Sequence, residues 1–231
     1  MLKQYSSQIL LVNHLSCLRQ AEIKSMKKII MTVLLVLNAV ATANAVEGNA
    51  EAGKGKAAMC AACHGADGNS LVPMYPKLAG LSASYLAKQL AEFKLGLTSG
   101  GKSGRANAIM GGMSMALSEQ DMADISAFYA SQQSTDGDGT ANAAGKKLYL
   151  GGNAEMEVTA CVACHGINGK GIPSAGFPAL AGQNAQYLKI QLEAFRNGSR
   201  NNDLNGMMQG VAANLTDEEI TALSQYSSSL K

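Results

Sequence analysis

Apolar and polar positions along this chain follow a helical period, and no segment keeps the two-residue alternation of a half-buried strand. The clearest stretch begins near Ser82. It places five of its larger side chains on one helical face: Tyr85, Leu86, Gln89, Leu90 and Phe93. The pattern therefore predicts an all-α protein.

The pattern occurs twice, which indicates an internal duplication. Cys60 corresponds to Cys161 at an offset of 101 residues. At an offset of 102 the matched pairs are Pro76 and Pro178, Gly80 and Gly182, Tyr85 and Tyr187, Gln89 and Gln191, and Phe93 and Phe195. At an offset of 98 they are Met110 and Met208, and Leu117 and Leu215. We expect helical domains over residues 46–133 and 142–231, joined by a linker over residues 134–141.

Three helices are predicted in each copy. The first covers roughly Ala50–Met59 or Ala143–Leu150, with small residues for close helix crossing at Gly53, Gly55 and Gly145. The middle helix is expected to stop at Gly96 or Gly198. The last opens with a capping box, formed by Ser118 and Asp121 or by Thr216 and Glu219. The Gly-, Asn- and Met-rich segments between the last two helices are predicted to be loops.

One pentapeptide, Cys-x-x-Cys-His, begins at Cys60 and again at Cys161. It is the attachment signature of a c-type haem, because two thiols on one helical turn can form thioethers with a single porphyrin. The following histidine then faces the iron as proximal ligand. The predicted thioether residues are Cys60, Cys63, Cys161 and Cys164, and the predicted iron ligands are His64 and His165.

Other uses of these cysteine pairs fit less well. A thioredoxin-like redox pair needs a βαβ setting, which the helical pattern does not supply. A zinc site needs a fourth ligand, yet the fifth cysteine, Cys17, and the third histidine, His14, both lie in the N-terminal leader. A structural disulfide does not explain the two histidines. Two covalent haems would also supply apolar surface to a chain with 5% aromatic residues and no Trp.

The sixth position on each iron falls to methionine, since no further histidine remains. The repeat alignment favours Met110 among Met110, Met113 and Met115, with Met113 as its rival. In the second copy it favours Met208, with Met207 as its rival. The carbonyls of Pro76 and Pro178 could accept the Nδ1–H of the proximal histidines, or these prolines could form plain turns.

Several polar residues remain open to two interpretations. Tyr85, Tyr187, Gln89 and Gln191 could reach haem propionates or simply pack on helix surfaces. Arg196 and Arg200 are expected on a solvated face, with propionate contact as the alternative.

The first 45 residues resemble a leader. Basic Met26–Lys28 precedes an apolar run, Ile29–Val40, and Ala43-Asn44-Ala45 is typical of a cleavage site. A secretory signal peptide is predicted over residues 26–45, with cleavage after Ala45 and export. Residues 1–25 are interpreted as an upstream misassigned start. The alternative is an uncleaved membrane anchor, although the run falls short of the ~20 residues that span a bilayer.

Removing the leader changes the sign of the charge. The chain has 19 basic and 17 acidic residues, of which residues 1–45 hold five and one, so the formal net charge changes from +2 to −2. This argues against a nucleic-acid partner. The predicted domains each hold seven basic and seven acidic residues. Docking to partners is therefore expected to use local patches and apolar contacts.

Taken together, Gly-Lys-Gly-Lys before Cys60, Tyr-Pro-Lys-Leu-Ala-Gly around Pro76 and Phe-Pro-Ala-Leu-Ala-Gly-Gln around Pro178 resemble the dihaem cytochrome c4 family. The resemblance covers residues 47–231 and implies tandem class I cytochrome c domains, each wrapped around one covalently bound haem. It implies Met110 and Met208 as axial ligands. It also implies a periplasmic carrier, soluble or loosely membrane-associated, that passes electrons towards a terminal oxidase.

The favoured function is thus an electron-transfer protein of a respiratory chain, without enzymatic activity. Its donor would be a quinol-oxidising cytochrome complex or a dehydrogenase, and its acceptor a terminal oxidase. The main alternative is the cytochrome subunit of a periplasmic dehydrogenase. A dihaem peroxidase would need an open iron and a distal acid–base group, and a gas sensor would need a labile iron.

Overall fold

The computed structural model describes residues 46–231. The predicted leader over residues 1–45, its signal peptide and the alternative of a retained anchor lie outside the described residues. Across 46–231, no helix has both the length and the apolar character needed to cross a membrane.

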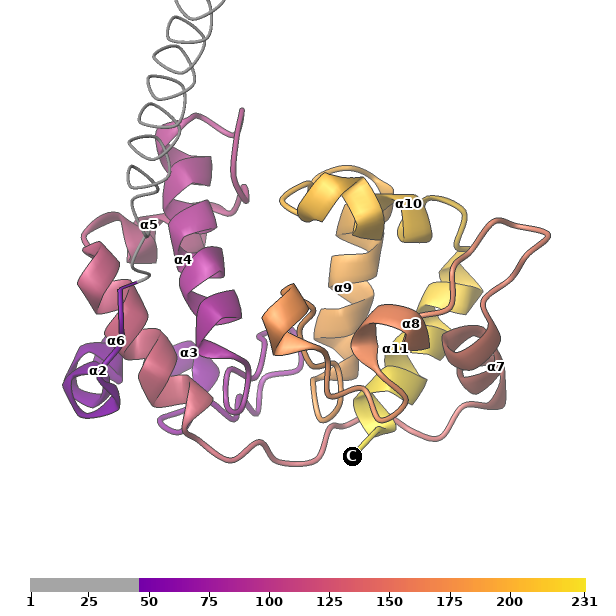
Figure 1. Cartoon of the computed structure of the whole chain (residues 1–231), viewed down its shortest axis with the longest axis horizontal. Coiled ribbons are helices and arrows are strands. Elements are labelled where there is room, and N and C mark those ends of the chain that lie inside the picture. The colour runs from indigo at the N-terminus through magenta and orange to yellow at the C-terminus, as the bar shows by residue number, and fades with distance from the viewer. Residues whose placement is uncertain (1–45) are drawn as a thin grey trace, which may run out of the picture. The chain divides into compact units, whose positions relative to one another are not determined.

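Two helical groups follow one another along the described chain (Figure 1). The first comprises α2 (Ala50–Lys56), α3 (Ala61–His64), α4 (Ala83–Thr98), α5 (Ala108–Met115) and α6 (Glu119–Ala130). The second comprises α7 (Ala143–Gly151), α8 (Val162–His165), α9 (Ala185–Arg196), α10 (Met207–Ala213) and α11 (Asp217–Ser229). Short 3-10 turns cover Ala57–Cys60, Pro173–Ala175 and Leu204–Gly206. Extended pairing within 46–231 is limited to two isolated bridges, so the all-α prediction is confirmed.

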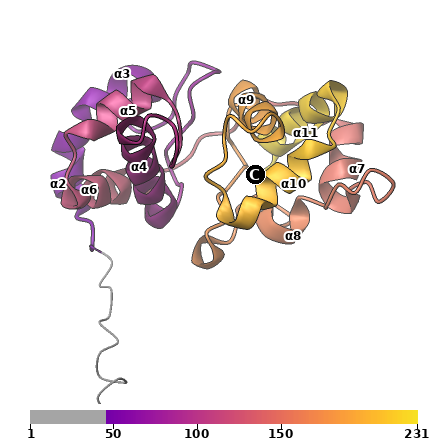
Figure 2. The same cartoon turned by 90° about the horizontal axis from the view of Figure 1, so that it is seen from above.

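Each helical group has its own small core, and Figure 2 shows the helices of the two groups from above. In the first, α2 packs on α6, and α4 packs on α5 and α6, around Ala57, Leu81, Leu86, Ile125 and Tyr129. In the second, α7 packs on α11, and α9 packs on α10 and α11, around Tyr149, Val158, Leu215, Ile220 and Leu223. The two copies therefore use the same helix pairs.

Glycine permits the close crossing of the first and last helices in each domain. A Cβ on Gly53 would collide with the backbone carbonyl of Asp124 in α6, and one on Gly145 would collide with that of Ala222 in α11. The sequence prediction for these two residues is confirmed. Gly55 faces open space, so it plays no part in the crossing.

Helix ends agree with prediction in some places and differ in others. Both capping boxes, at Ser118 and at Thr216, are present. Gly198 follows the end of α9 with φ of +74°, as expected of a stop. Gly96 is not a stop, because α4 continues to Thr98. A Cβ on Gly96 would instead collide with the carbonyl of Arg105. This glycine therefore allows the backbone at Arg105 to pack closely against α4.

The segments predicted as loops between the last two helices are partly helical. They contain α5 and α10, which correct the sequence prediction. The side chain of Asn107 caps α5 by accepting a hydrogen bond from the N–H of Met110 (2.9 Å). Packing on α4 and α9 stabilises these short helices, since their Gly-rich sequences have low intrinsic helix propensity.

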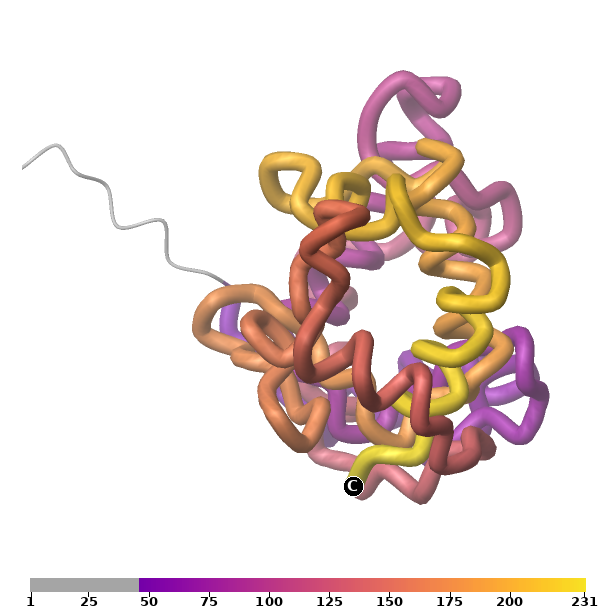
Figure 3. Tube along the Cα trace, turned by 90° about the vertical axis from the view of Figure 1, so that its right-hand side faces the viewer, coloured from indigo at the N-terminus to yellow at the C-terminus, as the bar shows by residue number. Residues whose placement is uncertain are grey.

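Residues 134–141, predicted as the linker, form neither helix nor strand. Figure 3 follows the trace of α11 to the C-terminus, which ends beside this segment. There Lys231 Nζ lies 2.6 Å from a carboxylate oxygen of Asp136. Asp138 accepts a hydrogen bond from the N–H of Ala185 (2.6 Å) and so caps α9. The linker is thus bound to the second domain, and it also binds the first, where the N–H of Thr135 donates to Oδ1 of Asn69 (2.9 Å).

Candidate haem-binding sites

Each Cys-x-x-Cys-His motif forms one short helical turn. Cys60 precedes α3 and Cys63 lies within it, while Cys161 and Cys164 occupy the same positions at α8. All four thiols are half-buried and none is in a disulfide. Three-residue spacing on a helical turn brings both thiols of a pair to one side, which is the arrangement that a doubly attached porphyrin requires.

A glycine in the left-handed region turns the chain away after each histidine. Gly65 follows His64 with φ of +82°, and Gly166 follows His165 with φ of +76°. Only glycine adopts this conformation without strain, so it allows the chain to leave the helical turn immediately after the histidine.

The two histidines are fixed by the same bond. Nδ1 of His64 lies 2.9 Å from the carbonyl oxygen of Pro76, and Nδ1 of His165 lies 2.9 Å from that of Pro178. A carbonyl only accepts, so Nδ1 carries the proton and Nε2 is left with a lone pair for a metal. The sequence alternative of plain turns at these prolines is excluded.

Burial keeps both imidazoles in the form that binds a metal. Each histidine is 6% exposed. Burial lowers the pKa of His64 and of His165, and the hydrogen bond to the proline carbonyl only partly opposes it. An aromatic ring lies beside each imidazole, Tyr75 in the first domain and Phe177 in the second, with ring centroids 6.3 and 6.4 Å apart. The two imidazoles therefore share the same burial, the same hydrogen bond to a proline carbonyl and an adjacent aromatic ring.

The candidate methionines lie on the short helices α5 and α10. Met110 and Met113 are both half-buried and three residues apart, on one face of α5, whereas Met115 is 43% exposed. In α10 Met208 is half-buried and Met207 is 38% exposed. Burial thus favours Met208 over Met207 but does not separate Met110 from Met113, and the ligand assignments stay predictions.

Two buried arginines lie among residues from both domains. Arg105 and Arg200 are each 8% exposed. The guanidinium of Arg105 stacks over the ring of Phe93 (4.6 Å to the centroid), and that of Arg200 stacks over Phe195 (4.4 Å). This corrects the expectation that Arg200 lies on a solvated face. Arg196, given the same expectation, pairs at the surface with Asp217.

The partners of these arginines are neutral. Arg105 donates to Oε1 of Gln89 (2.8 Å), to Oε1 of Gln191 (2.5 Å) and to the hydroxyl of Tyr187 (3.1 Å). Arg200 donates to the same two glutamine oxygens (3.3 and 2.9 Å) and to the hydroxyl of Tyr85 (3.1 Å). We call these six residues the arginine cluster.

The arginine cluster has an excess of positive charge. Neither arginine forms an ion pair with a carboxylate of residues 46–231. Burial by itself raises the pKa of Tyr187, but the charges of Arg105 and Arg200 outweigh it and lower that pKa. Buried cations need anionic partners. The donor set therefore fits the propionate carboxylates of haem.

Sequence reasoning singled out five of these six residues but not Arg105. Its only sequence signal is that it is the single arginine among the seven basic residues of 46–133. Arginine is the usual choice for buried contacts to carboxylates. The repeat alignment could not reveal the pair, because Arg105 and Arg200 are 95 positions apart, unlike the residues around them.

Comparison with known proteins agrees with this geometry. The model of the family described as cytochrome c matches residues 50–133 and again 143–231. Cytochrome c4 of Stutzerimonas stutzeri is 46% identical over 206 residues, covering 87% of this chain and 98% of the relative. The thiosulfate dehydrogenase electron acceptor of Stutzerimonas stutzeri (strain A1501) is 40% identical over 183 residues, covering 76% and 81%.

A solved structure is similar over both domains. Reduced recombinant cytochrome c4 from Pseudomonas stutzeri matches with a TM-score of 0.76 at 46% identity, over 80% of this chain and 100% of that one. The two Cys-x-x-Cys-His motifs lie within the matched domains and imply two covalently attached haem c groups. The chain therefore belongs to the dihaem cytochrome c4 family and is a dihaem electron-transfer cytochrome.

Proposed function

We propose that this protein is a periplasmic electron carrier of a respiratory chain that delivers electrons towards a terminal oxidase. The observation that carries the proposal is the identical fixing of His64 and His165 by proline carbonyls in two domains of one chain. Two matched haem sites in one polypeptide suit a protein that transfers electrons. With only three histidines in the sequence, two of them in the motifs and one in the leader, no histidine is left for distal acid–base chemistry.

In this proposal the cysteines attach the haems, and the histidines and methionines bind the irons. Cys60 and Cys63, and Cys161 and Cys164, hold the two haems by thioethers. His64 and Met110 bind one iron, and His165 and Met208 bind the other. When bound, each haem supplies an iron that alternates between Fe(II) and Fe(III), and a methionine ligand raises its reduction potential.

The surface near the motifs offers apolar contact to a redox partner. Leu71, seven residues after His64, is 94% exposed, and Ile167, two residues after His165, is 68% exposed. Both domains carry as many basic as acidic residues, so long-range charge steering contributes little. Docking through small apolar contacts with a modest buried area suits a short-lived electron-transfer complex.

Export to the periplasm, with cleavage after Ala45, is part of the same proposal. Its support is the signal-like sequence of residues 26–45. The exported protein would be soluble or loosely membrane-associated. N-terminal sequencing of protein purified from a periplasmic extract tests it, with Val46 expected as the first residue.

A second function is favoured by one observation, the 40% identity to a thiosulfate dehydrogenase electron acceptor. The chain could thus receive its electrons from a periplasmic dehydrogenase rather than from a quinol-oxidising complex. Both alternatives use the same motifs, so they differ only in the donor.

Electron flow through the purified protein distinguishes the two donors. The reduced protein is mixed with membranes, and its reoxidation is followed in the presence and absence of cyanide. Cyanide-sensitive reoxidation supports delivery to a terminal oxidase. In the reverse experiment the oxidised protein is mixed with membranes plus quinol, or with a purified thiosulfate dehydrogenase plus thiosulfate. Rapid reduction only in the second mixture would favour the dehydrogenase, and no reoxidation by membranes would contradict the carrier proposal.

A further inference from the structure

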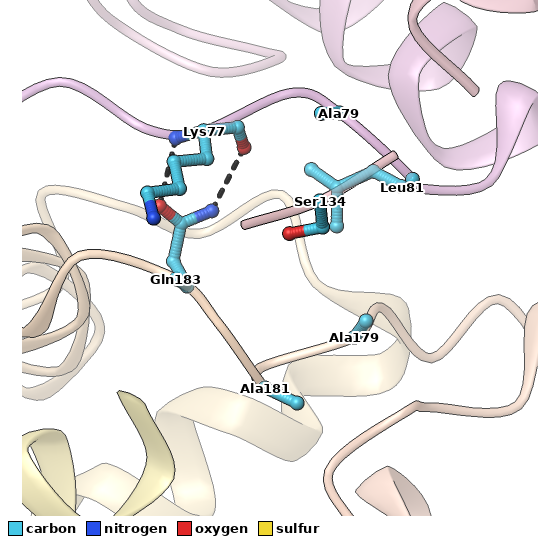
Figure 4. A pocket seen from close by; sticks show the side chains of 8 residues that line it. Lys77, Ala79, Leu81, Ser134, Ala179, Ala181 and Gln183 are labelled. Atoms are coloured by element: carbon cyan, nitrogen blue, oxygen red, sulfur yellow. Dashed lines mark hydrogen bonds between the residues drawn. The ribbon is translucent and has the colours of Figure 1, made fainter. Parts of the chain in front are cut away.

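A glutamine of the second domain binds the backbone beside the proximal histidine of the first. Oε1 of Gln183 accepts a hydrogen bond from the N–H of Lys77 (2.8 Å), and Nε2 of Gln183 donates to the carbonyl of Lys77 (2.8 Å). Figure 4 shows the side-chain amide of Gln183 facing the backbone of Lys77, with both bonds drawn. Both residues are buried, so water competes little for these bonds.

The N–H of Lys77 and the carbonyl of Pro76 belong to one peptide group. That group is planar and trans, so its N–H and C=O point in opposite directions. His64 donates to the Pro76 oxygen at one end, and Gln183 accepts from the Lys77 N–H at the other. The imidazole, the peptide group and the glutamine amide therefore form a continuous chain of two hydrogen bonds.

Hydrogen bonds in such a chain polarise one another. Donation by the Lys77 N–H to Gln183 places more negative charge on the Pro76 oxygen, which strengthens the bond from His64. A stronger bond at Nδ1 makes the imidazole a more basic ligand. A more basic ligand favours ferric over ferrous iron.

We propose that Gln183 is a positioning residue through which the second domain lowers the reduction potential of the haem in the first. The proposal rests on the ligation of iron by His64 given under Proposed function. Gln183 itself does not touch the haem in this account. It acts only through the Pro76–Lys77 peptide group.

The duplication makes this tuning one-sided. At the offset of 102 residues, Gln183 corresponds to Leu81 and Lys77 corresponds to Ala179. The side chain of Leu81 is aliphatic and lies in the core of the first domain. It has no atom that could accept a hydrogen bond from the Pro178–Ala179 peptide group. Two otherwise equivalent sites therefore differ in their second hydrogen bond.

The neighbouring Asn184 supplies a matched control. Its Nδ2 donates to the carbonyls of Ser70, Val72 and Tyr75 (3.3, 3.3 and 2.9 Å), so it also joins the two domains. It makes no hydrogen bond to the Pro76–Lys77 peptide group. Its counterpart Ser82 caps α4 of its own domain. The backbone N–H of Asn184 donates to Oε1 of Gln183 (2.9 Å), and serine keeps this backbone donor. An Asn184→Ser variant thus removes the side-chain bonds across the same interface and leaves the proposed chain of bonds in place.

We choose methionine rather than alanine to replace Gln183, because a small cavity lies beside this side chain. A cavity with about 40 Å³ open to a water-sized sphere lies beside Gln183, next to Leu81 and Ala179. This is enough for water, which needs at least ~10–15 Å³. Gln183→Ala would enlarge the space and admit a water that could replace the lost acceptor. Gln183→Met keeps the length of the side chain and removes both hydrogen bonds to Lys77, together with the one that Oε1 accepts from the N–H of Asn184.

The test is a redox titration of the exported holoprotein, followed by NMR signals assigned to each haem. In Gln183→Met we expect the ferrous-to-ferric equilibrium of the first haem to rise about threefold, which is about 28 mV at 59 mV per tenfold. The second haem should not change, and Asn184→Ser should change neither. In the reduced protein, the Nδ1–H of His64 should exchange faster with solvent in Gln183→Met.

A second variant should not raise the potential of the first haem. Gln183→Glu keeps an oxygen acceptor for the Lys77 N–H and adds negative charge, so the first haem's potential should equal or fall below that of the wild type. The inference is wrong if Gln183→Met leaves that potential unchanged, if Asn184→Ser shifts it equally, or if Gln183→Glu raises it. If the variants then keep the spectrum of methionine-ligated haem, only the inference about Gln183 fails, and the proposed carrier function is unaffected.

Discussion

Arg105 in the first domain donates a hydrogen bond of 2.5 Å to Oε1 of Gln191 in the second. The same oxygen accepts from Arg200 at 2.9 Å. Two guanidinium groups that share one neutral acceptor, without a carboxylate from residues 46–231, place positive charge between the two haem domains. This charge bears directly on the reduction potentials.

Replacement of Arg105 should lower the potentials. A buried positive charge destabilises the ferric state, which is the more positive one, so Arg105→Leu should favour ferric haem on the order of tenfold, or about 59 mV for one electron. The matched control is Lys102→Gln, which removes an exposed charge three residues away. Its effect should be small and should vanish with added salt. Redox titration at two ionic strengths measures both, and equal shifts in the two variants would contradict the buried-charge account.

Methionine replacements test the ligands in the second domain. Met208→Ala should abolish the weak near-infrared band of methionine-ligated ferric haem for one haem of two. Met207→Ala, its 38% exposed neighbour, should leave the band intact. The absorption spectrum of the oxidised protein measures the band. Retention of the full band in Met208→Ala would refute the assignment.

The first domain needs a separate comparison, because Met110 and Met113 share a face of α5. We expect Met110→Ala to remove the band of the other haem and Met113→Ala to keep it. A loss of the band in Met113→Ala, with Met110→Ala unaffected, would move the ligand by one helical turn.

Gly53 and Gly55 give a paired test of the helix crossing. A Cβ on Gly53 meets the carbonyl of Asp124, so Gly53→Ala should lower the free energy of unfolding by about 1–3 kcal/mol, as overpacking does. Gly55→Ala meets nothing within 4 Å and should be neutral or stabilise by up to ~1 kcal/mol, through helix propensity. Denaturant unfolding of the two holoproteins measures the difference. Equal stability of the variants would show that α2 and α6 do not cross closely.

The first domain should lose stability in acid through Asp124. Lys56 donates to this carboxylate (2.7 Å), with the N–H of Asn49 and the amide of Gln120 as further donors (both 2.8 Å). Together they lower the pKa of Asp124 from 3.8 to about 2. Because the folded-state pKa lies below the ordinary value, the stabilisation is complete above 3.8. It is lost as the pH falls from 3.8 through about 2.

Asp124→Asn should flatten this part of the pH profile. Thermal unfolding midpoints of the two proteins, measured between pH 5 and pH 2, should converge at the acid end. The equivalent helix crossing in the second domain has Ala222 in place of Asp124. The unfolding of the second domain should therefore show no corresponding dependence on pH in this range. A constant difference between the two midpoints over this range would mean that Asp124 does not contribute through its charge.

The sequence predicted those features that depend on neighbouring residues. The haem motifs, both capping boxes and the glycines at the helix crossings follow from short spacings. The bonds from His64 and His165 to the prolines were one of two predicted alternatives. The helices α5 and α10 were missed because packing, not local propensity, stabilises them. Gly96 was misread as a helix stop. Its role depends on the backbone at Arg105, which packs against it, and the residues next to Gly96 in the sequence do not indicate this contact.

The arginine cluster and the Gln183 contact lay beyond sequence reasoning for another reason. Both join residues of different domains, such as Arg105 with Gln191, and the repeat alignment compares equivalent positions rather than contacting ones. Asn184 illustrates the limit. It aligns with the helix cap Ser82, yet its amide binds carbonyls of the first domain, and Asp138 of the linker caps its helix instead.

One absorption spectrum of the exported protein, recorded through a redox titration and then under carbon monoxide, tests the central claim most directly. The account predicts two haems c per chain, a near-infrared band from both irons when oxidised, and no change with carbon monoxide when reduced. Exported protein without covalent haem, or two irons that readily bind carbon monoxide, would contradict it.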